Sequence, residues 1–140
     1  MSATVQGELW SSDPRGWAET AEGRIRPLYE RVLEGLHPLP GTRLLDAGCG
    51  SGLFAELAAQ GGADVIGLDA APGLVEYARR RRPAAGYVVG DLERMPFGDG
   101  DGDIAVLALA EQLDRDTGAH RLAGHQISER LIRRDRKSVV

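Results

Sequence analysis

A glycine-rich segment between an apolar strand and a helix constrains this chain more than any other feature. It reads Leu44-Leu-Asp-Ala-Gly-Cys-Gly-Ser-Gly-Leu53, with glycines at positions 48, 50 and 52. Glycine lets the backbone adopt a positive φ and lets a ligand approach without a Cβ in the way. The first N–H groups of the following helix have no intrahelical partner. The segment therefore predicts a nucleotide-type pocket at the carboxyl end of the first strand of an α/β sheet.

Strand-like and helix-like patterns alternate around this segment. Apolar strands are expected at 43–46, 65–69, 87–89 and 103–109, and helices at 17–36, 53–60 and from 72 to about 82. In the first helix Ile25, Leu28, Val32 and Leu36 are spaced to share one face, and Pro27 is expected to start or kink it. This order predicts an α/β, Rossmann-like parallel sheet with flanking helices, right-handed crossovers and cover on both faces.

Three regions follow from the same patterns. Residues 1–41 form an N-terminal helical segment, 42–110 form the α/β core with the binding site, and 111–140 are a poorly specified tail. Only the first four strands of such a fold are recognisable. The opening residues lack the layout of a signal peptide, and no apolar run is long enough to span a bilayer.

Acidic residues follow the strands where a ligand would lie. Asp46 precedes the glycines, Asp69 ends the second strand, and Asp91 follows the third. A dinucleotide fingerprint would place its third glycine at position 53, which is leucine here. Three carboxylates without a nearby lysine suit a neutral or cationic ligand and disfavour a pyrophosphate.

Ordinary structural roles compete with each of these assignments. The glycines are also compatible with a tight turn, Asp69 with a solvated strand end, and Asp91 with a Gly-Asp turn. Cys49 is interpreted as a small residue between glycines and not as a reactive thiolate, because no histidine or lysine adjoins it. The arginines at 79–82 are interpreted as complementing a helix dipole and not as a nucleic-acid site.

Three motifs together resemble those of class I S-adenosylmethionine-dependent methyltransferases. They are Asp46-Ala-Gly-Cys-Gly-Ser-Gly52, Gly67-Leu-Asp-Ala70 and Val89-Gly-Asp-Leu-Glu-Arg-Met-Pro-Phe97. Their order and spacing are most similar to the small-molecule type (methyltransferase type 11) related to ubiquinone and menaquinone methyltransferases. The similarity covers about Arg43 to Leu109.

The resemblance implies S-adenosylmethionine as cofactor and assigns roles by position. Asp46 would hold the methionine amino group through water, and the loop residues Ala47, Gly48, Cys49, Gly50 and Gly52 would pass close to the methionyl and ribose groups. Asp69 would bind the ribose hydroxyls, and Ala70 and Leu92 would line the adenine. Asp91 would accept from the adenine amine, while Leu107 and Ala108 would lie beside the sulfonium. No catalytic residue and no metal ligand is assigned.

We therefore expect methyl transfer to a small-molecule acceptor by in-line displacement. The alternatives are a non-catalytic S-adenosylmethionine-binding fragment and an NAD(P)-dependent oxidoreductase domain. A single cysteine and a formal net charge of −4 favour a cytoplasmic protein without a nucleic-acid partner. The oligomeric state and the acceptor are not indicated.

The family pattern fades after Leu109. The resemblance implies further helices and strands, so we expect the chain to be truncated at its C-terminus. Its last residues, Asp135-Arg-Lys-Ser-Val-Val140, match a translated sequencing adapter. The tail at 111–140 is accordingly expected to be truncated or in part artefactual.

Overall fold

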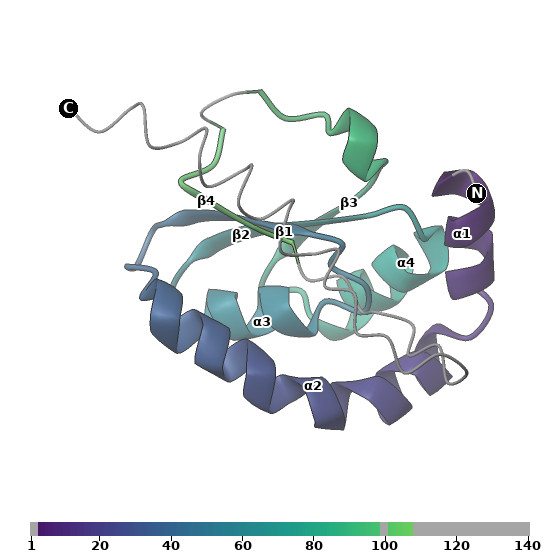
Figure 1. Cartoon of the computed structure of the whole chain (residues 1–140), viewed down its shortest axis with the longest axis horizontal. Coiled ribbons are helices and arrows are strands. Elements are labelled where there is room, and N and C mark those ends of the chain that lie inside the picture. The colour runs from purple at the N-terminus through teal and green to yellow at the C-terminus, as the bar shows by residue number, and fades with distance from the viewer. Residues whose placement is uncertain (1–2, 99–100, 108–140) are drawn as a thin grey trace, which may run out of the picture.

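The fold is seen in a computed structural model that describes residues 3–98 and 101–107. A parallel sheet has the order β3-β2-β1-β4, with β1 (Arg43–Ala47), β2 (Asp64–Asp69), β3 (Gly86–Val89) and β4 (Ile104–Leu107) (Figure 1). The helices are α1 (Ala3–Trp10), α2 (Pro14–Leu36), α3 (Leu53–Gln60), α4 (Pro72–Arg81) and the 3-10 helix η1 (Leu92–Arg94). The predicted Rossmann-like parallel sheet with flanking helices is confirmed. The predicted tail at 111–140 lies outside the described residues.

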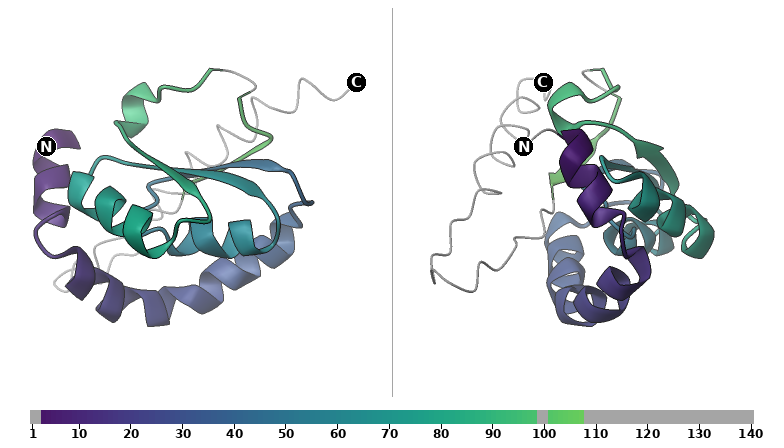
Figure 2. Two further views of the ribbon diagram at one scale, coloured as in Figure 1. Left: turned by 180° about the vertical axis from the view of Figure 1, so that it is seen from behind. Right: turned by 90° about the vertical axis from the view of Figure 1, so that its right-hand side faces the viewer.

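The helices α2, α3 and α4 all lie on one face of the sheet (Figures 1 and 2). The crossovers β1-α3-β2 and β2-α4-β3 step in the same direction, so right-handed connections place both helices on that face. The opposite face carries Ile66, which is 39% exposed. We expected helices on both faces of the sheet. Within the described residues, helices cover one face only.

The chain reverses direction after β3 and returns to place β4 beside β1. The register pairs Leu44 with Val65 of β2 and with Ile104 of β4. The sheet order thus changes direction between β1 and β4. In open α/β sheets, ligands bind outside the carboxyl ends of the strands at such a switch point.

Helix α2 begins earlier than predicted and continues through Pro27. Asp13 caps its first turn, because the Asp13 carboxylate accepts from the Gly16 N–H at 2.9 Å. Pro27 lacks the N–H that would bond to the Gly23 carbonyl, but both residues are exposed, so water can reach that carbonyl. The predicted apolar face is wrong at Leu28, which is 59% exposed.

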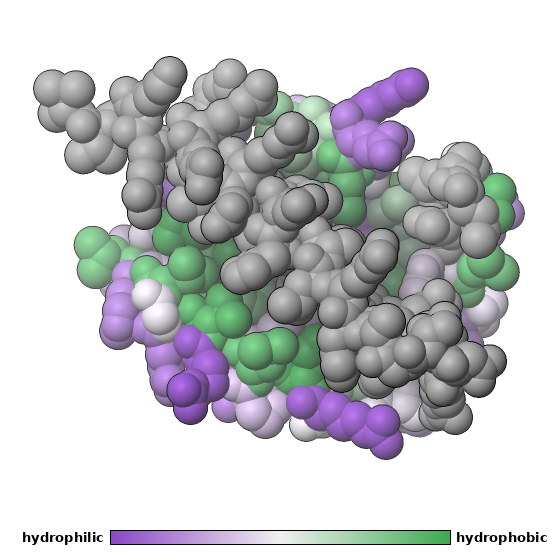
Figure 3. All heavy atoms as spheres, viewed as in Figure 1, coloured by the Kyte–Doolittle hydropathy of each residue, from purple (hydrophilic) through white to green (hydrophobic). Residues whose placement is uncertain are grey.

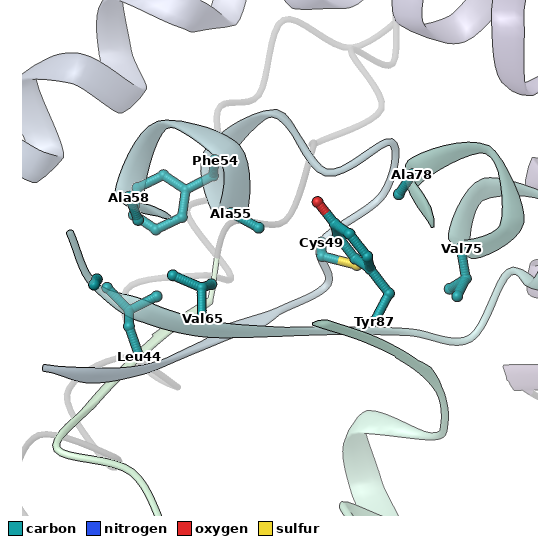
Figure 4. Packing of buried hydrophobic residues seen from close by; sticks show 10 residues of the cluster. Leu44, Cys49, Phe54, Ala55, Ala58, Val65, Val75, Ala78 and Tyr87 are labelled. Carbon is teal, nitrogen blue, oxygen red and sulfur yellow. The ribbon is translucent and has the colours of Figure 1, made fainter. Parts of the chain in front are cut away.

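The core lies between the sheet and helices α3 and α4 (Figure 4). Phe54 is 1% exposed and meets Tyr29 of α2 edge-to-face, with ring centroids 5.3 Å apart. Tyr87 rises from β3 beside Cys49. A Cβ at Gly67 would lie 2.9 Å from the Cys49 sulfur, so a glycine on β2 lets the loop after β1 pack directly on the sheet.

Candidate functional site

The glycine loop, residues 48–52, joins β1 to α3 at the switch point. Gly48, Gly50 and Gly52 have φ values of +80°, +53° and +85°, which L side chains rarely adopt. A Cβ at Gly52 would also lie 2.8 Å from the Tyr87 hydroxyl oxygen, whereas one at Gly50 would enter open space. The loop therefore needs glycine for its conformation, and at Gly50 its backbone faces a space that a ligand can enter.

Asp69 ties this loop to the one that follows β2. Its Oδ2 accepts from the Gly50 N–H at 2.8 Å, and its Oδ1 accepts from the Ala71 N–H at 2.9 Å. The Leu68 carbonyl accepts from the N–H groups of Gly48 and Cys49, at 2.7 and 3.0 Å. These bonds fix a half-buried carboxylate at the carboxyl ends of the two central strands.

A cavity opens beside these loops. Six predicted site residues line it: Gly48, Cys49, Gly50, Asp69, Ala70 and Leu92. Its remaining lining residues come from α1, α2, the glycine loop, α3 and α4: Gly7, Trp10, Trp17, Ala21, Glu22, Ile25, Tyr29, Ser51, Leu53 and Leu74. Seven of these lining residues come from α1 and α2, to which the sequence motifs assigned no site residue.

Among the other predicted site residues, Asp46, Ala47, Gly52 and Asp91 do not line the cavity. Asp46 and Ala47 are buried before the loop, and Gly52 is buried at its end. Asp91 accepts from the Glu93 N–H at 2.9 Å and so begins η1. The backbone of Leu107 pairs with Ala47 of β1, and Ala108 lies outside the described residues.

The wall formed by α1 and α2 is largely apolar. Trp10 and Trp17 meet edge-to-face with ring centroids 4.8 Å apart, and both face the cavity. The structure therefore places both rings at the site. For Glu22 no sequence signal was available, because its partners are distant in the chain. Figure 3 shows hydrophilic residues along the lower rim, where α2 lies in Figure 1.

Asp46 is a buried carboxyl with no hydrogen-bond partner on either oxygen. Burial, and then the nearby Asp69, raise its pKa to about 7. The Ala55 N–H faces the carboxyl and opposes this rise without reaching hydrogen-bond geometry. Asp46 is thus a fully buried carboxyl without a hydrogen-bond partner, next to the glycine loop.

The cavity lining carries two carboxylates, Glu22 and Asp69, and no lysine, arginine or histidine among the described residues. Such a wall disfavours phosphate and suits a neutral or cationic ligand.

Burial raises the pKa of the Cys49 thiol, so Cys49 is not a thiolate nucleophile. No cluster of three metal-ligating side chains occurs in residues 3–98 and 101–107. Within those ranges no helix combines the length and apolarity required to cross a bilayer.

Residues 45–117, just over half of the chain, match the methyltransferase domain family. The chain belongs to this family. It is 38% identical to malonyl-[acyl-carrier protein] O-methyltransferase of Serratia marcescens, over 74% of this chain and 41% of that protein. It is 33% identical to demethylmenaquinone methyltransferase of Renibacterium salmoninarum, over 62% of this chain and 37% of that one.

A solved structure shows the same fold. It is the S-adenosylmethionine-dependent methyltransferase of Geobacter sulfurreducens in complex with S-adenosyl-L-homocysteine, with a TM-score of 0.51 and 25% identity. The match covers 59% of this chain and 35% of that one. The chain thus spans well under half the length of each of these three proteins. The predicted resemblance to class I methyltransferases is confirmed.

Proposed function

We propose that this chain binds S-adenosylmethionine in the cavity and is the cofactor-binding part of a methyltransferase for a small-molecule acceptor. The observation that carries the proposal is the Asp69 carboxylate, held by Gly50 and Ala71 at the rim of a cavity without cationic side chains. Open space above Gly50 and the unpartnered Asp46 fit a ligand with hydroxyl groups and an ammonium group. A pyrophosphate would find carboxylates where it needs cations.

Each residue is proposed to act by binding or orientation. Asp69 would accept from the two ribose hydroxyls, with Ala70 and Leu92 beside the adenine. Asp46 would accept from the methionine amino group through water, and Asp91 from the adenine amine. The backbone at Gly48 and Gly50 would pass along the ligand, because glycine carries no Cβ and the space at Gly50 is open.

The same proposal extends to the rest of the loop and to the fourth strand. Ala47, Cys49 and Gly52 would shape the loop behind the ligand, and Leu107 would lie near the reacting methyl group at the end of β4. We also propose that the chain divides into regions at residues 41 and 110, and that the protein is cytoplasmic.

Bound S-adenosylmethionine would supply a methyl group activated by its sulfonium, and the acceptor would attack the methyl carbon in line as the carbon–sulfur bond breaks and S-adenosylhomocysteine leaves. The protein contributes mainly proximity and orientation to such a transfer. Trp10 and Trp17 would exclude water from the cavity. No residue is proposed as a general base. The small-molecule acceptor is supported by the demethylmenaquinone methyltransferase among the relatives.

Isothermal titration calorimetry of the 140-residue chain tests this proposal. S-adenosylmethionine and S-adenosylhomocysteine should bind with a stoichiometry of one, and NADH should not bind. A methyl-transfer assay with a demethylated quinone acceptor then separates a catalytic chain from one that only binds the cofactor. Binding of NADH without binding of S-adenosylmethionine would overturn the proposal in favour of an oxidoreductase.

A further inference from the structure

A carboxylate on α2 connects the glycine loop to a buried arginine. Glu22 accepts from the Ser51 hydroxyl at 2.8 Å and, through its second oxygen, from Arg82 Nη2 at 2.7 Å. Arg82 follows the end of α4 and also pairs with Glu56 of α3. Side chains of α2, of α3 and of the residue after α4 therefore form one cluster beside the loop, and Glu22 itself also lines the cavity.

Burial sets this cluster apart from the other ion pairs of α2. The Arg82 side chain is 5% exposed and that of Glu22 is 17% exposed, whereas both side chains of the Arg26–Glu30 pair are about half exposed. Exposed pairs contribute little to stability, but removing one partner of a buried pair leaves an uncompensated charge. The Ser51 hydroxyl and Arg82 each bind one oxygen of Glu22, and Arg81 Nη1 lies 3.8 Å from the oxygen that faces Ser51, so the carboxylate is held in one place.

The glycine loop is held from two sides. On the β2 side, Asp69 accepts from the Gly50 N–H. On the α2 side, Glu22 accepts from the hydroxyl of Ser51, which is 5% exposed and lies between two glycines with positive φ. Gly50 and Gly52 give the loop little intrinsic rigidity, because glycine loses more conformational freedom on ordering than other residues. The bond to Ser51 limits that freedom.

We propose that Glu22 is a positioning residue, whose carboxylate holds Ser51 and keeps the glycine loop in its ligand-binding conformation. This inference rests on the proposed function, because it assigns a role toward the same ligand. Arg82 orients Glu22 from the side away from Ser51. Binding is tightest when a loop is ordered before the ligand arrives, so loss of the Glu22–Ser51 bond should weaken binding without removing any direct ligand contact.

Ser51→Ala is the sharpest test, since it deletes one hydroxyl and leaves the Glu22–Arg82–Glu56 cluster intact. Glu22→Gln changes the same contact from the other side. Glu30→Gln is the matched control, on the same helix in an exposed pair. Calorimetry with S-adenosylhomocysteine, well below the unfolding midpoint, gives the dissociation constants. Amide hydrogen exchange at Gly50 and Gly52 in the ligand-free chain reports loop order independently of activity.

We expect both site variants to weaken binding about 10-fold, the scale of one hydrogen bond to a charged group. The double variant should be no weaker than the worse single one, because both changes weaken the order that Glu22 gives to the loop through Ser51. Exchange at Gly50 and Gly52 should accelerate in Ser51→Ala, and Glu30→Gln should match the unaltered chain in both measurements.

Three results would overturn the inference. Unchanged binding and exchange in Ser51→Ala would show that the hydroxyl does not order the loop. Weaker binding in Glu22→Gln alone would mean that Glu22 contacts the ligand itself. Additive losses in the double variant would mean that the residues act separately. Failure of the unaltered chain to bind either S-adenosyl ligand would instead contradict the proposed function, which keeps the two failures distinct.

Discussion

The cavity has two walls that are held in place by different groups. The loops after β1 and β2 form one wall, the loop wall, and helices α1 and α2 form the other, the helical wall. The loop wall is fixed mainly by backbone groups, as where Asp69 accepts from the N–H groups of Gly50 and Ala71. The helical wall is fixed by side chains, as where Glu22 reaches Ser51 and Arg82. Substitutions should therefore act on the loop wall mainly at glycines, at carboxylates and at Ser51, and on the helical wall at many side chains.

Helix α1 joins the two walls by a close backbone contact. A Cβ at Gly7 would overlap the carbonyl oxygen of Ala70. The Ser11 hydroxyl accepts from the Gly73 N–H at 2.9 Å and donates to the Gly7 carbonyl at 2.6 Å. Ser11 thereby caps α4, whose own N-cap residue is Ala71 and has no side-chain bond. The docking of α1 thus depends on the loop that carries the proposed adenine-binding residue.

The largest effect is expected at the carboxylate of the loop wall. Asp69→Asn should weaken S-adenosylmethionine binding about 100-fold, because bonds of two N–H groups to a charged acceptor are lost or weakened. Calorimetry measures the change. Asp64→Asn, at the exposed start of the same strand, is the control and should bind normally. Equal binding by both variants would mean that Asp69 does not organise the wall.

A pH-dependent effect on stability is expected from Asp46. With its pKa raised to about 7, the folded state keeps a proton that the unfolded state has lost between about pH 4 and 7. The free energy of unfolding should therefore fall as pH rises through this window, by about 2 to 3 kcal/mol between pH 5 and 8 from this group. Urea unfolding at both pH values measures it. In Asp46→Asn, the decrease in the free energy of unfolding between pH 5 and 8 should be smaller by this amount. An identical decrease in the variant would show that Asp46 does not cause it.

Glycine substitutions compare the close contact of α1 with an open position on α2. Gly7→Ala should destabilise the chain by about 2 kcal/mol, because α1 must shift away from Ala70. Gly23→Ala meets nothing within 4 Å and should stabilise α2 by about 0.5 to 1 kcal/mol. Thermal unfolding of both variants shows whether each substitution raises or lowers the stability of the chain. If both substitutions changed the stability in the same direction, α1 would not be docked as described.

The smallest effect is expected at the cap that joins α1 to α4. Ser11→Ala should reduce the free energy of unfolding by about 1 kcal/mol, since the Gly73 N–H loses its acceptor. Ser12→Ala is the neighbouring control, because the Ser12 hydroxyl bonds only locally to Leu9. A larger loss in Ser12→Ala than in Ser11→Ala would argue against the cap.

The sequence predicted the helices and strands whose limits are set by neighbouring residues in the chain. Helix α3 has the predicted bounds, and the strands agree to within a few residues, because apolar strands and glycines mark their own limits. Helix α1 was missed, since Leu9 is exposed and the contact of Gly7 with Ala70 spans more than sixty residues. Asp69 could be named from its place after a strand, whereas Glu22 lies within a helix among many charged residues.

The arginines at 79–82 show the same limit. Their interpretation as complements to a helix dipole fits Arg79, Arg80 and Arg81, which lie in the last turn of α4. Arg82 differs, being buried between Glu22 and Glu56. No property of four consecutive identical residues distinguishes the one that enters the interior.

The sequence by itself determined the parallel sheet, the glycine loop and the acidic residues after the strands, because periodicity, positive φ and strand ends are properties of short segments. Only the tertiary structure decided that Trp10, Trp17 and Glu22 close the cavity from the other side. It also decided that one carboxylate on α2 reaches the loop. These contacts join residues far apart in the chain, and their geometry exists only once the helices have packed against the sheet.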